Sequence, residues 1–296
     1  MRVTHRMLAQ SVSKNIQNNL RSLDKRSRQL SIGRYFDRPS GDPVGTYKVM
    51  GINGIGLSRN EQYRRNIGEG VTWLTITEDA LAEAADVINR LKELSIYAST
   101  GTLSPEDRLI IAPEAEQLYH HLVLAGNTEI GCLYLFGGHK TQEPPFELTD
   151  GKVMFKGDDG ERIIEITTAN SMAINIKAEL VFGENMETFK TIEGLLDALR
   201  NNDLEKLGGV ILEELDGALN RLLQGRSEIG AKMARLLSTD DRLHGEHIHL
   251  RELRSKIEDL DVAEAIMELV MQENAYQASL ATGARMIYPS LIDFLR

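Results

Sequence analysis

The chain has little of what secreted proteins and most enzymes contain. Cys132 is the only cysteine among 296 residues, so neither an intramolecular disulfide nor a cysteine-based zinc site can form. Aromatic residues make up only 5% of the chain, and no apolar run is long enough to span a bilayer. The N-terminal residues lack the apolar core and the small-residue cleavage site of a secretory signal. By these signals alone we expect a cytoplasmic protein, and any export would need a route without a cleaved signal.

The charge balance argues against a general nucleic-acid-binding protein. Lysine and arginine total 34 against 44 aspartates and glutamates, which gives a formal net charge of −10. A general nucleic-acid binder would instead have a basic face. We therefore expect neither a nucleic acid nor a membrane as partner.

Both ends of the chain show the apolar spacing of helices that pack lengthwise. Steps of three and four residues repeat in each stripe, as in a coiled coil. At 1.5 Å per residue, the C-terminal stripe would be roughly 40–50 Å long and would need a partner. The two ends are expected to pair with each other or with the ends of neighbouring copies, and to be disordered in the monomer until assembly. The predicted assembly interface comprises Val3, Met7, Val12, Ile16, Leu20, Leu23, Ile266, Leu269, Tyr276, Leu280, Ile287 and Leu291.

In the middle of the chain, the spacing of apolar residues changes twice between a helical and a strand-like period. Residues 35–46 break the first helix, and a helical pattern returns over 73–98, where Thr77 is a candidate cap. Ser104 followed by Pro105 predicts the start of another helix. Between about 131 and 185 the period is two, and Gly157 to Gly160 has the composition of a hairpin loop. Helical spacing then returns near Met186 and runs from 204 to 260 as one very long helix or two.

These patterns predict a mainly α fold with a β-rich insertion, in three nested domains. Residues 1–38 with 262–296 would form a terminal coiled-coil domain. Residues 39–130 with 204–261 would form a helical bundle domain, and residues 131–203 a β-rich outer domain.

Candidate chemistry is sparse. His244, His247 and His249 lie close in sequence, but on a helix only the first two share a face, so a solvated helix or a turn at Gly245 is favoured over a metal site. Ser40 has a neighbouring acid, Asp42, but no assignable histidine base. We predict no enzyme, no catalytic residue, no metal and no cofactor.

Several separate stretches of the first 141 residues form a recognisable set. They are Arg2-Val3-Thr4, Asn15-Ile16-Gln17, Leu30-Ser31-Ile32-Gly33-Arg34, Pro39-Ser40-Gly41-Asp42-Pro43, Gln62-Tyr63, Trp73-Leu74, Asp107-Arg108 and Tyr134-Leu135-Phe136-Gly137-Gly138. With these stretches, the first 141 residues resemble the flagellin superfamily and, more narrowly, its family of hook–filament junction proteins (hook-associated protein 3). Gly41 stands where the family usually has the first aspartate of a Pro-Ser-Asp-Asp-Pro turn, and residues 142–200 show no match.

The resemblance implies a flagellin-like architecture and a structural role in the bacterial flagellum. It implies export without a cleaved signal peptide, through the flagellar type III export apparatus with a cytosolic chaperone, to an extracellular position. The implied assembly is a ring of copies between hook-associated protein 1 and flagellin, with head-to-tail and lateral contacts. Three alternatives stay open: a flagellin-type filament subunit, a cytoplasmic coiled-coil scaffold, and a metal-dependent enzyme using His244, His247 and His249.

Overall fold

The computed structural model describes residues 5–101, 103–149 and 151–287, and the side chains of 7–101, 103–149 and 151–285. The chain divides into two compact units. The terminal unit contains residues 1–59 and 246–296, and the central unit contains residues 60–245. The three-part division expected from the sequence stays a prediction at this finer level. No helix of the described ranges is long and apolar enough to cross a membrane.

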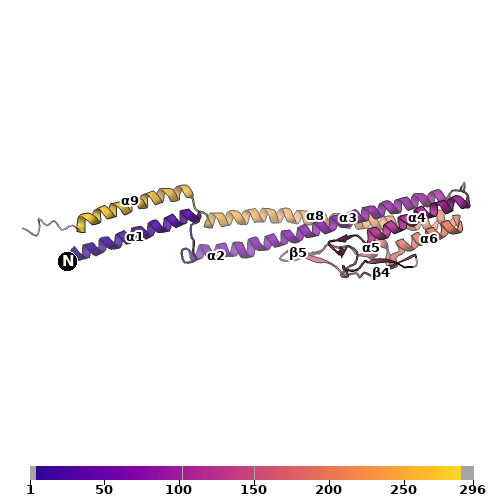
Figure 1. The fold of residues 1–296 in the computed structure, drawn as a ribbon, viewed down its shortest axis with the longest axis horizontal. Helices are drawn as coiled ribbons and strands as arrows, with labels where there is room; N and C mark the ends of the chain where they lie inside the picture. The colour runs from indigo at the N-terminus through magenta and orange to yellow at the C-terminus, as the bar shows by residue number, and fades with distance from the viewer. Residues whose placement is uncertain (1–4, 102, 150, 288–296) are drawn as a thin grey trace, which may run out of the picture. The chain divides into compact units, whose positions relative to one another are not determined.

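Helices at the two ends of the chain build the terminal unit (Figure 1). Helix α1 is His5–Ile32 and helix α9 is Val262–Ile287. Helix α2, Pro43–Gly51, begins inside the stretch that the sequence predicted to break the helix. Its start is stabilised because the Asp42 carboxylate accepts hydrogen bonds from the N–H groups of Val44 (3.1 Å) and Gly45 (3.0 Å). The glycines that follow do not end the helical path, since residues Ile52–Leu57 continue it as a π-helix, η1.

Four antiparallel helices organise the central unit: α3 (Ser58–Ser99), α4 (Pro105–Gly126), α6 (Glu187–Asn201) and α8 (Val210–Glu258). Their order is visible in Figure 1 and in the cross-helix ion pairs. Arg90 pairs with Glu114 between α3 and α4 at 2.7 Å, and Arg226 pairs with Glu78 between α8 and α3 at 2.6 Å. The short helices α5 (Ala178–Phe182), η2 (Glu184–Met186) and α7 (Leu204–Gly208) connect these elements.

One predicted helix start is confirmed and one predicted cap is wrong. Ser104 and Asp107 form a reciprocal capping box at the start of α4. Thr77 lies inside α3, and its hydroxyl donates to the carbonyl oxygen of Trp73 at 2.8 Å. The cap prediction failed because the glycines of residues 58–72 do not interrupt α3, which begins at Ser58.

The β-rich segment consists of three two-stranded antiparallel hairpins. They pair β1 (Glu129–Ile130) with β2 (Leu133–Tyr134), β3 (Phe146–Thr149) with β4 (Lys152–Phe155), and β5 (Ile163–Thr167) with β6 (Asn170–Ala173). The predicted hairpin loop at Gly157–Gly160 is wrong, because this segment connects β4 and β5, which do not pair with each other. The Asp158 carboxylate holds it as an irregular loop, accepting from the N–H groups of His139 (2.6 Å) and Gly160 (2.9 Å).

An aromatic cluster attaches the hairpins to the helices. Phe146 of β3 packs on Phe182 and Phe189, with ring centroids 5.1 Å apart in both cases. Five of the seven phenylalanines belong to this cluster, which lies within the main apolar core. Most of the phenylalanines are therefore concentrated where the β-rich segment meets the bundle.

Candidate assembly surface

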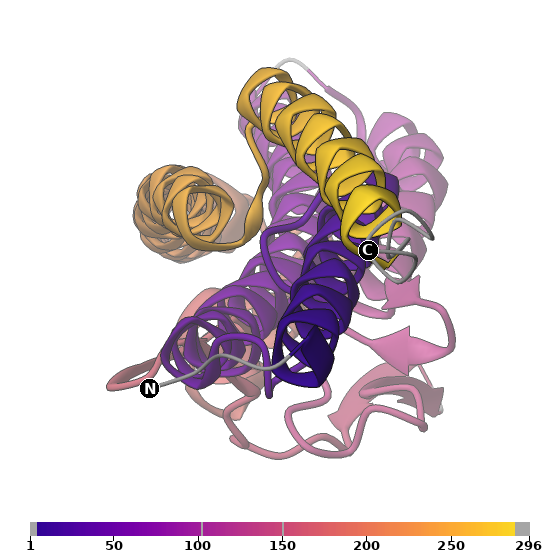
Figure 2. The same cartoon turned by 90° about the vertical axis from the view of Figure 1, so that its left-hand side faces the viewer.

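Helices α1 and α9 pack lengthwise against each other in an antiparallel pair. They lie side by side in both views of the ribbon, indigo and yellow (Figures 1 and 2). Arg26 of α1 forms an ion pair with Glu268 of α9 at 2.8 Å. Gly283 of α9 lies against Val12 and Ile16 of α1. The predicted pairing of the two chain ends is therefore confirmed within one copy.

The covered faces of this pair follow a regular heptad spacing. On α1 the more covered residues recur in steps of three and four, and on α9 the same steps recur with smaller and more polar side chains. Because alanine, serine and glycine offer little apolar area, this contact buries much less than an all-leucine seam would. The covered positions are Ala9, Val12, Ile16, Asn19, Leu23, Arg26, Gln29 and Leu30 on α1, and Ala265, Glu268, Leu269, Gln272, Tyr276, Ser279 and Gly283 on α9.

The structure separates the predicted interface residues into three groups. Val12, Ile16, Leu23, Leu269 and Tyr276 are partly buried between α1 and α9. A second group points to solvent: Met7, Leu20, Ile266 and Leu280 are each more than 40% exposed. Val3 and Leu291 lie outside the described residues, and the side chain of Ile287 is not described.

The exposed side of α9 is as apolar as its covered side. Five large apolar residues lie near its start, and Met267 and Met271 are 61% and 63% exposed. A contiguous apolar patch on a surface marks an interaction site more often than an isolated exposed leucine does. The patch consists of Val262, Ile266, Met267, Val270 and Met271, and we refer to it as the α9 patch.

Apolar periodicity missed the small residues that permit close packing. A Cβ atom added at Gly283 would lie 3.1 Å from Val12 Cγ1 and 3.2 Å from Ile16 Cδ1. Ala265 is 3% exposed, although alanine contributes little to an apolar stripe. These covered positions could have been predicted from the heptad spacing of Ala265, Gln272, Ser279 and Gly283, if small and polar residues had been counted as well as large apolar ones.

Backbone hydrogen bonds fix the ends of α1 and α9 that lie nearest α8. Gly33 has a φ of +69° and ends α1, with its N–H donating to the Gln29 carbonyl at 2.9 Å. The Leu260 N–H donates to the Gly33 carbonyl at 3.1 Å, and the Tyr35 N–H donates to the Glu258 carbonyl at 2.8 Å. Arg34 also pairs with the Glu258 carboxylate at 2.7 Å. The segment that leaves α1 and the segment that enters α9 are thus tied together.

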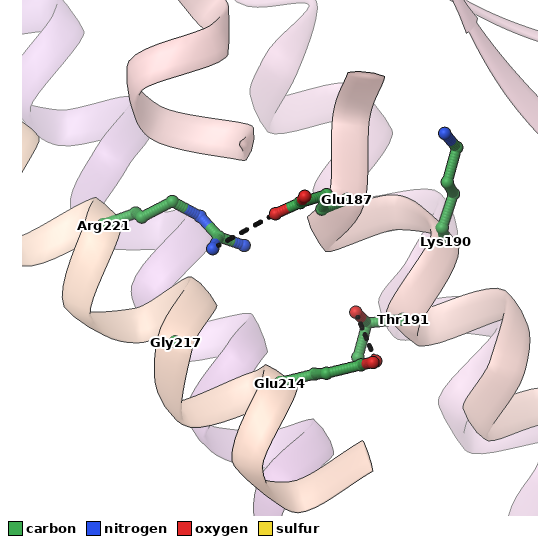
Figure 3. A pocket seen from close by; sticks show the side chains of 6 residues that line it. All are labelled: Glu187, Lys190, Thr191, Glu214, Gly217 and Arg221. Atoms are coloured by element: carbon green, nitrogen blue, oxygen red, sulfur yellow. Dashed lines mark hydrogen bonds and ion pairs between the residues drawn. The ribbon is translucent and has the colours of Figure 1, made fainter. Parts of the chain in front are cut away.

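A polar groove between α6 and α8 is the other candidate site, and its volume is about 460 Å³. Its charged groups largely satisfy one another. Figure 3 shows Arg221 and Glu187 pointing toward each other, 3.5 Å apart, while Thr191 donates to Glu214 at 3.0 Å. The side chain of Lys190 points away from both pairs in this view. The groove contains no histidine or cysteine among its lining residues, and its arrangement provides no nucleophile with a base.

The three histidines do not converge. His244 and His249 are exposed on α8, while His247 is partly covered and its Nδ1 atom is buried without a hydrogen-bond partner. Within the described residues, no group of three histidine, cysteine, aspartate or glutamate side chains could hold a metal ion. The exposed apolar faces of the terminal unit therefore remain the strongest candidate functional surface.

Comparison with known proteins identifies the class. The N-terminal helical region of bacterial flagellin matches residues 3–141, and its C-terminal helical region matches residues 212–295. The chain belongs to the flagellin superfamily, as the resemblance in its first 141 residues indicated. Flagellin-like relatives include the flagellar filament 33 kDa core protein of Treponema phagedenis, 24% identical over 306 residues.

Individual relatives narrow the assignment within this superfamily to the hook-associated proteins. The chain is similar to flagellar hook-associated protein 3 of Salmonella typhimurium, with 26% identity over 324 residues and all of both chains covered. The same protein of Escherichia coli is 26% identical, with 94% of this chain and 95% of the relative covered. The fold resembles a solved flagellar hook-associated protein of Vibrio parahaemolyticus, with a TM-score of 0.69, 18% identity, and 74% of this chain and all of that chain covered.

These relatives confirm the structural role expected from the sequence. The chain is a structural component of the bacterial flagellum, of the hook-associated, hook–filament junction kind, and so acts outside the cell.

Proposed function

We propose that this component connects two other flagellar parts, hook-associated protein 1 on the hook side and flagellin on the filament side. The observation that carries the proposal is the α9 patch, whose large apolar side chains are exposed on a helix that already has a partner. A soluble monomer gains nothing from such a surface, whereas a subunit between two others needs one.

The terminal unit would then assemble through both of its helices. Met7 and Leu20 of α1, with Ile266 and Leu280 of α9, lie on the exposed sides and can contact neighbouring subunits. Val12, Ile16, Leu23, Leu269 and Tyr276 keep α1 and α9 together within each copy. Contacts of this kind join unlike surfaces, so they stack copies into a ring or layer.

We further propose that the chain has no catalytic activity and reaches its place through the flagellar export apparatus with a cytosolic chaperone. The support is the absence of a nucleophile–base pair in the groove of Figure 3 and the structural role of its relatives. A chain with one cysteine needs no oxidative step after export.

The test is incorporation of a charged variant. Leu280→Asp should leave the central unit folded but abolish assembly, because each buried apolar side chain contributes roughly 1.5–3 kcal/mol and a buried unpaired charge costs more. The measurement is the amount of the chain in flagella isolated from cells that lack their own copy of the gene. Gln277→Asp, an exposed polar position on the same helix, is the matched control. Normal incorporation of Leu280→Asp would refute the assignment of this face.

The alternative is a filament subunit, which the flagellin-like relatives keep in view. A filament subunit would polymerise with itself, so the purified chain would seed long filaments without other subunits. A junction subunit would stop at short assemblies.

A further inference from the structure

The outer face of α2 and η1 is apolar to an unusual degree. Val44, Tyr47, Met50 and Ile55 are 65%, 79%, 67% and 66% exposed. The opposite side of the same segment is buried, with Val49 and Leu57 each 6% exposed. A surface helix normally presents polar residues outward, and one that is apolar all round is normally enclosed. This segment is apolar on both sides, which indicates that its outer face has a partner.

Two glycines lie within this outer face. A Cβ atom added at Gly51 or Gly54 would have no atom within 4 Å, so packing in the described chain does not require glycine at either position. Gly56, by contrast, lies against Leu250 of α8, whose Cδ1 would be 3.1 Å from such a Cβ. Each glycine in a helix destabilises it by roughly 0.5–1 kcal/mol relative to alanine. Since Gly51 and Gly54 carry no side chain, the backbone of another helix can approach closely there.

The charge of the N-terminal residues indicates what kind of helix could dock on the outer face of α2 and η1. Lys48 is the only charged residue from 43 to 57, and residues 1–66 hold 13 of the 34 lysines and arginines but only 4 of the 44 aspartates and glutamates. The complementary helix should therefore be apolar on its contact face and acidic beside it.

Helix α9 has these properties. Its exposed α9 patch spans residues 262–271, about 15 Å of helix, against about 22 Å for α2 and η1 together. Glu264, Glu268 and Glu273 lie in or beside this stretch, and the first positive residue of α9 is Arg285. Met267 and Met271 are unbranched and flexible, so they can adapt to an irregular surface.

We propose that the α9 patch of one copy docks on the outer face of α2 and η1 of a second copy. This proposal rests on the proposed function, which makes the exposed side of α9 an assembly surface. It adds that the outer face of α2 and η1 of another copy receives that surface. The two surfaces differ, so each copy can bind one neighbour through its α9 patch and another through its α2 and η1 face. The contact can therefore repeat from copy to copy.

Cross-linking tests the proposal. In a Cys132→Ser background, chains carrying Tyr47→Cys and Met271→Cys separately are mixed at assembling concentration and treated with a short bis-maleimide. The expected product is a heterodimer, at least about tenfold more abundant than from Glu252→Cys mixed with Met271→Cys, equivalent to about 1.4 kcal/mol of preference. Glu252 is exposed on α8 in the same unit and serves as the matched control.

Two further results would overturn the proposal. A chain carrying both Tyr47→Cys and Met271→Cys that cross-links within itself at high dilution would show that α9 reaches its own α2. A mixture giving no more heterodimer than the control would show that the surfaces do not meet.

Incorporation into flagella separates this contact from the proposed function. Tyr47→Glu and Met271→Glu are both expected to lose incorporation, with circular dichroism confirming the helices. If only Met271→Glu loses it, α9 is an assembly surface but α2 is not its receptor. If both variants incorporate normally, the proposed function fails as well.

Discussion

Cys132 occupies a position where its side chain is unfavourable. Gly131 and Cys132 form the two-residue loop between β1 and β2, with φ values of 54° and 70°. Such a turn requires positive φ at both positions, which glycine adopts easily and cysteine does not.

Cys132→Gly is therefore expected to raise the free energy of unfolding by about 1 kcal/mol, because it removes the left-handed strain. Urea unfolding followed by circular dichroism would measure the change. Cys132→Ala removes the thiol but keeps the Cβ atom, so it should give no gain. Equal stabilisation by both variants would assign the effect to the thiol.

Asp158 links stability to acidity. The N–H groups of His139 and then Gly160 donate to its carboxylate and hold its pKa below the usual 3.8. Since the folded pKa is below the unfolded one, its contribution is present above pH 3.8 and is lost as the pH falls through the folded pKa.

Asp158→Asn should consequently be less stable than the wild type at pH 7, and the difference should shrink in acid. Melting temperatures across a pH series would show this convergence. Asp159→Asn is the neighbouring control and should follow the wild-type curve. A difference that is constant with pH would exclude the carboxylate as its cause.

At the scale of elements, the α1–α9 pair depends on a missing side chain. Gly283→Val would place methyl groups where a Cβ already lies 3.1 Å from Val12 Cγ1, so the helices must separate locally. The expected loss is about 1–3 kcal/mol in the terminal unit, seen as faster amide exchange in α1. Ala281→Val lies on the exposed side of the same helix and should leave exchange unchanged. Unchanged exchange in Gly283→Val would show that α1 and α9 are not closely packed there.

Phe146 is the side chain through which β3 meets the bundle. It is 2% exposed and packs on Phe155, Phe182 and Phe189. Phe146→Ala should destabilise the central unit by about 3–5 kcal/mol, measured by urea unfolding. Met154→Ala, at an exposed position on β4, should change stability by less than about 0.5 kcal/mol.

The sequence predicted these elements unevenly. Strong apolar periodicity located α3, α8 and the two terminal helices, and Ser104 located the start of α4. It located the covered side of α9 only in part. Leu269 and Tyr276 are covered as expected, but Ala265 and Gly283 carry no apolar signal, while exposed Ile266 and Leu280 carry a strong one. The Gly157–Gly160 loop had the composition of a hairpin turn, but strand pairing depends on contacts distant in sequence.

At the scale of the whole chain, charge is divided along the sequence. Residues 1–66 are strongly basic and the remainder is strongly acidic. Association between copies that uses this difference should weaken as ionic strength rises, because the Debye length falls from about 10 Å at 0.1 M to about 3 Å at 1 M. Sedimentation at increasing sodium chloride concentration would measure it. Association that strengthens with salt would indicate that apolar burial alone drives it.

The chain also carries its own optical reporter. Trp73 is the single tryptophan, it is 5% exposed, and the guanidinium carbon of Arg162 lies 4.3 Å from its ring centroid. Its emission should therefore be shifted toward short wavelengths in the folded chain and should move when the packing of α3 against Arg162 is lost. Residues 1–59 and 246–296 contain no tryptophan, so tryptophan emission, excited selectively over tyrosine, follows the central unit alone. Fluorescence and circular dichroism recorded together would then time the ordering of the chain ends separately from that of the bundle.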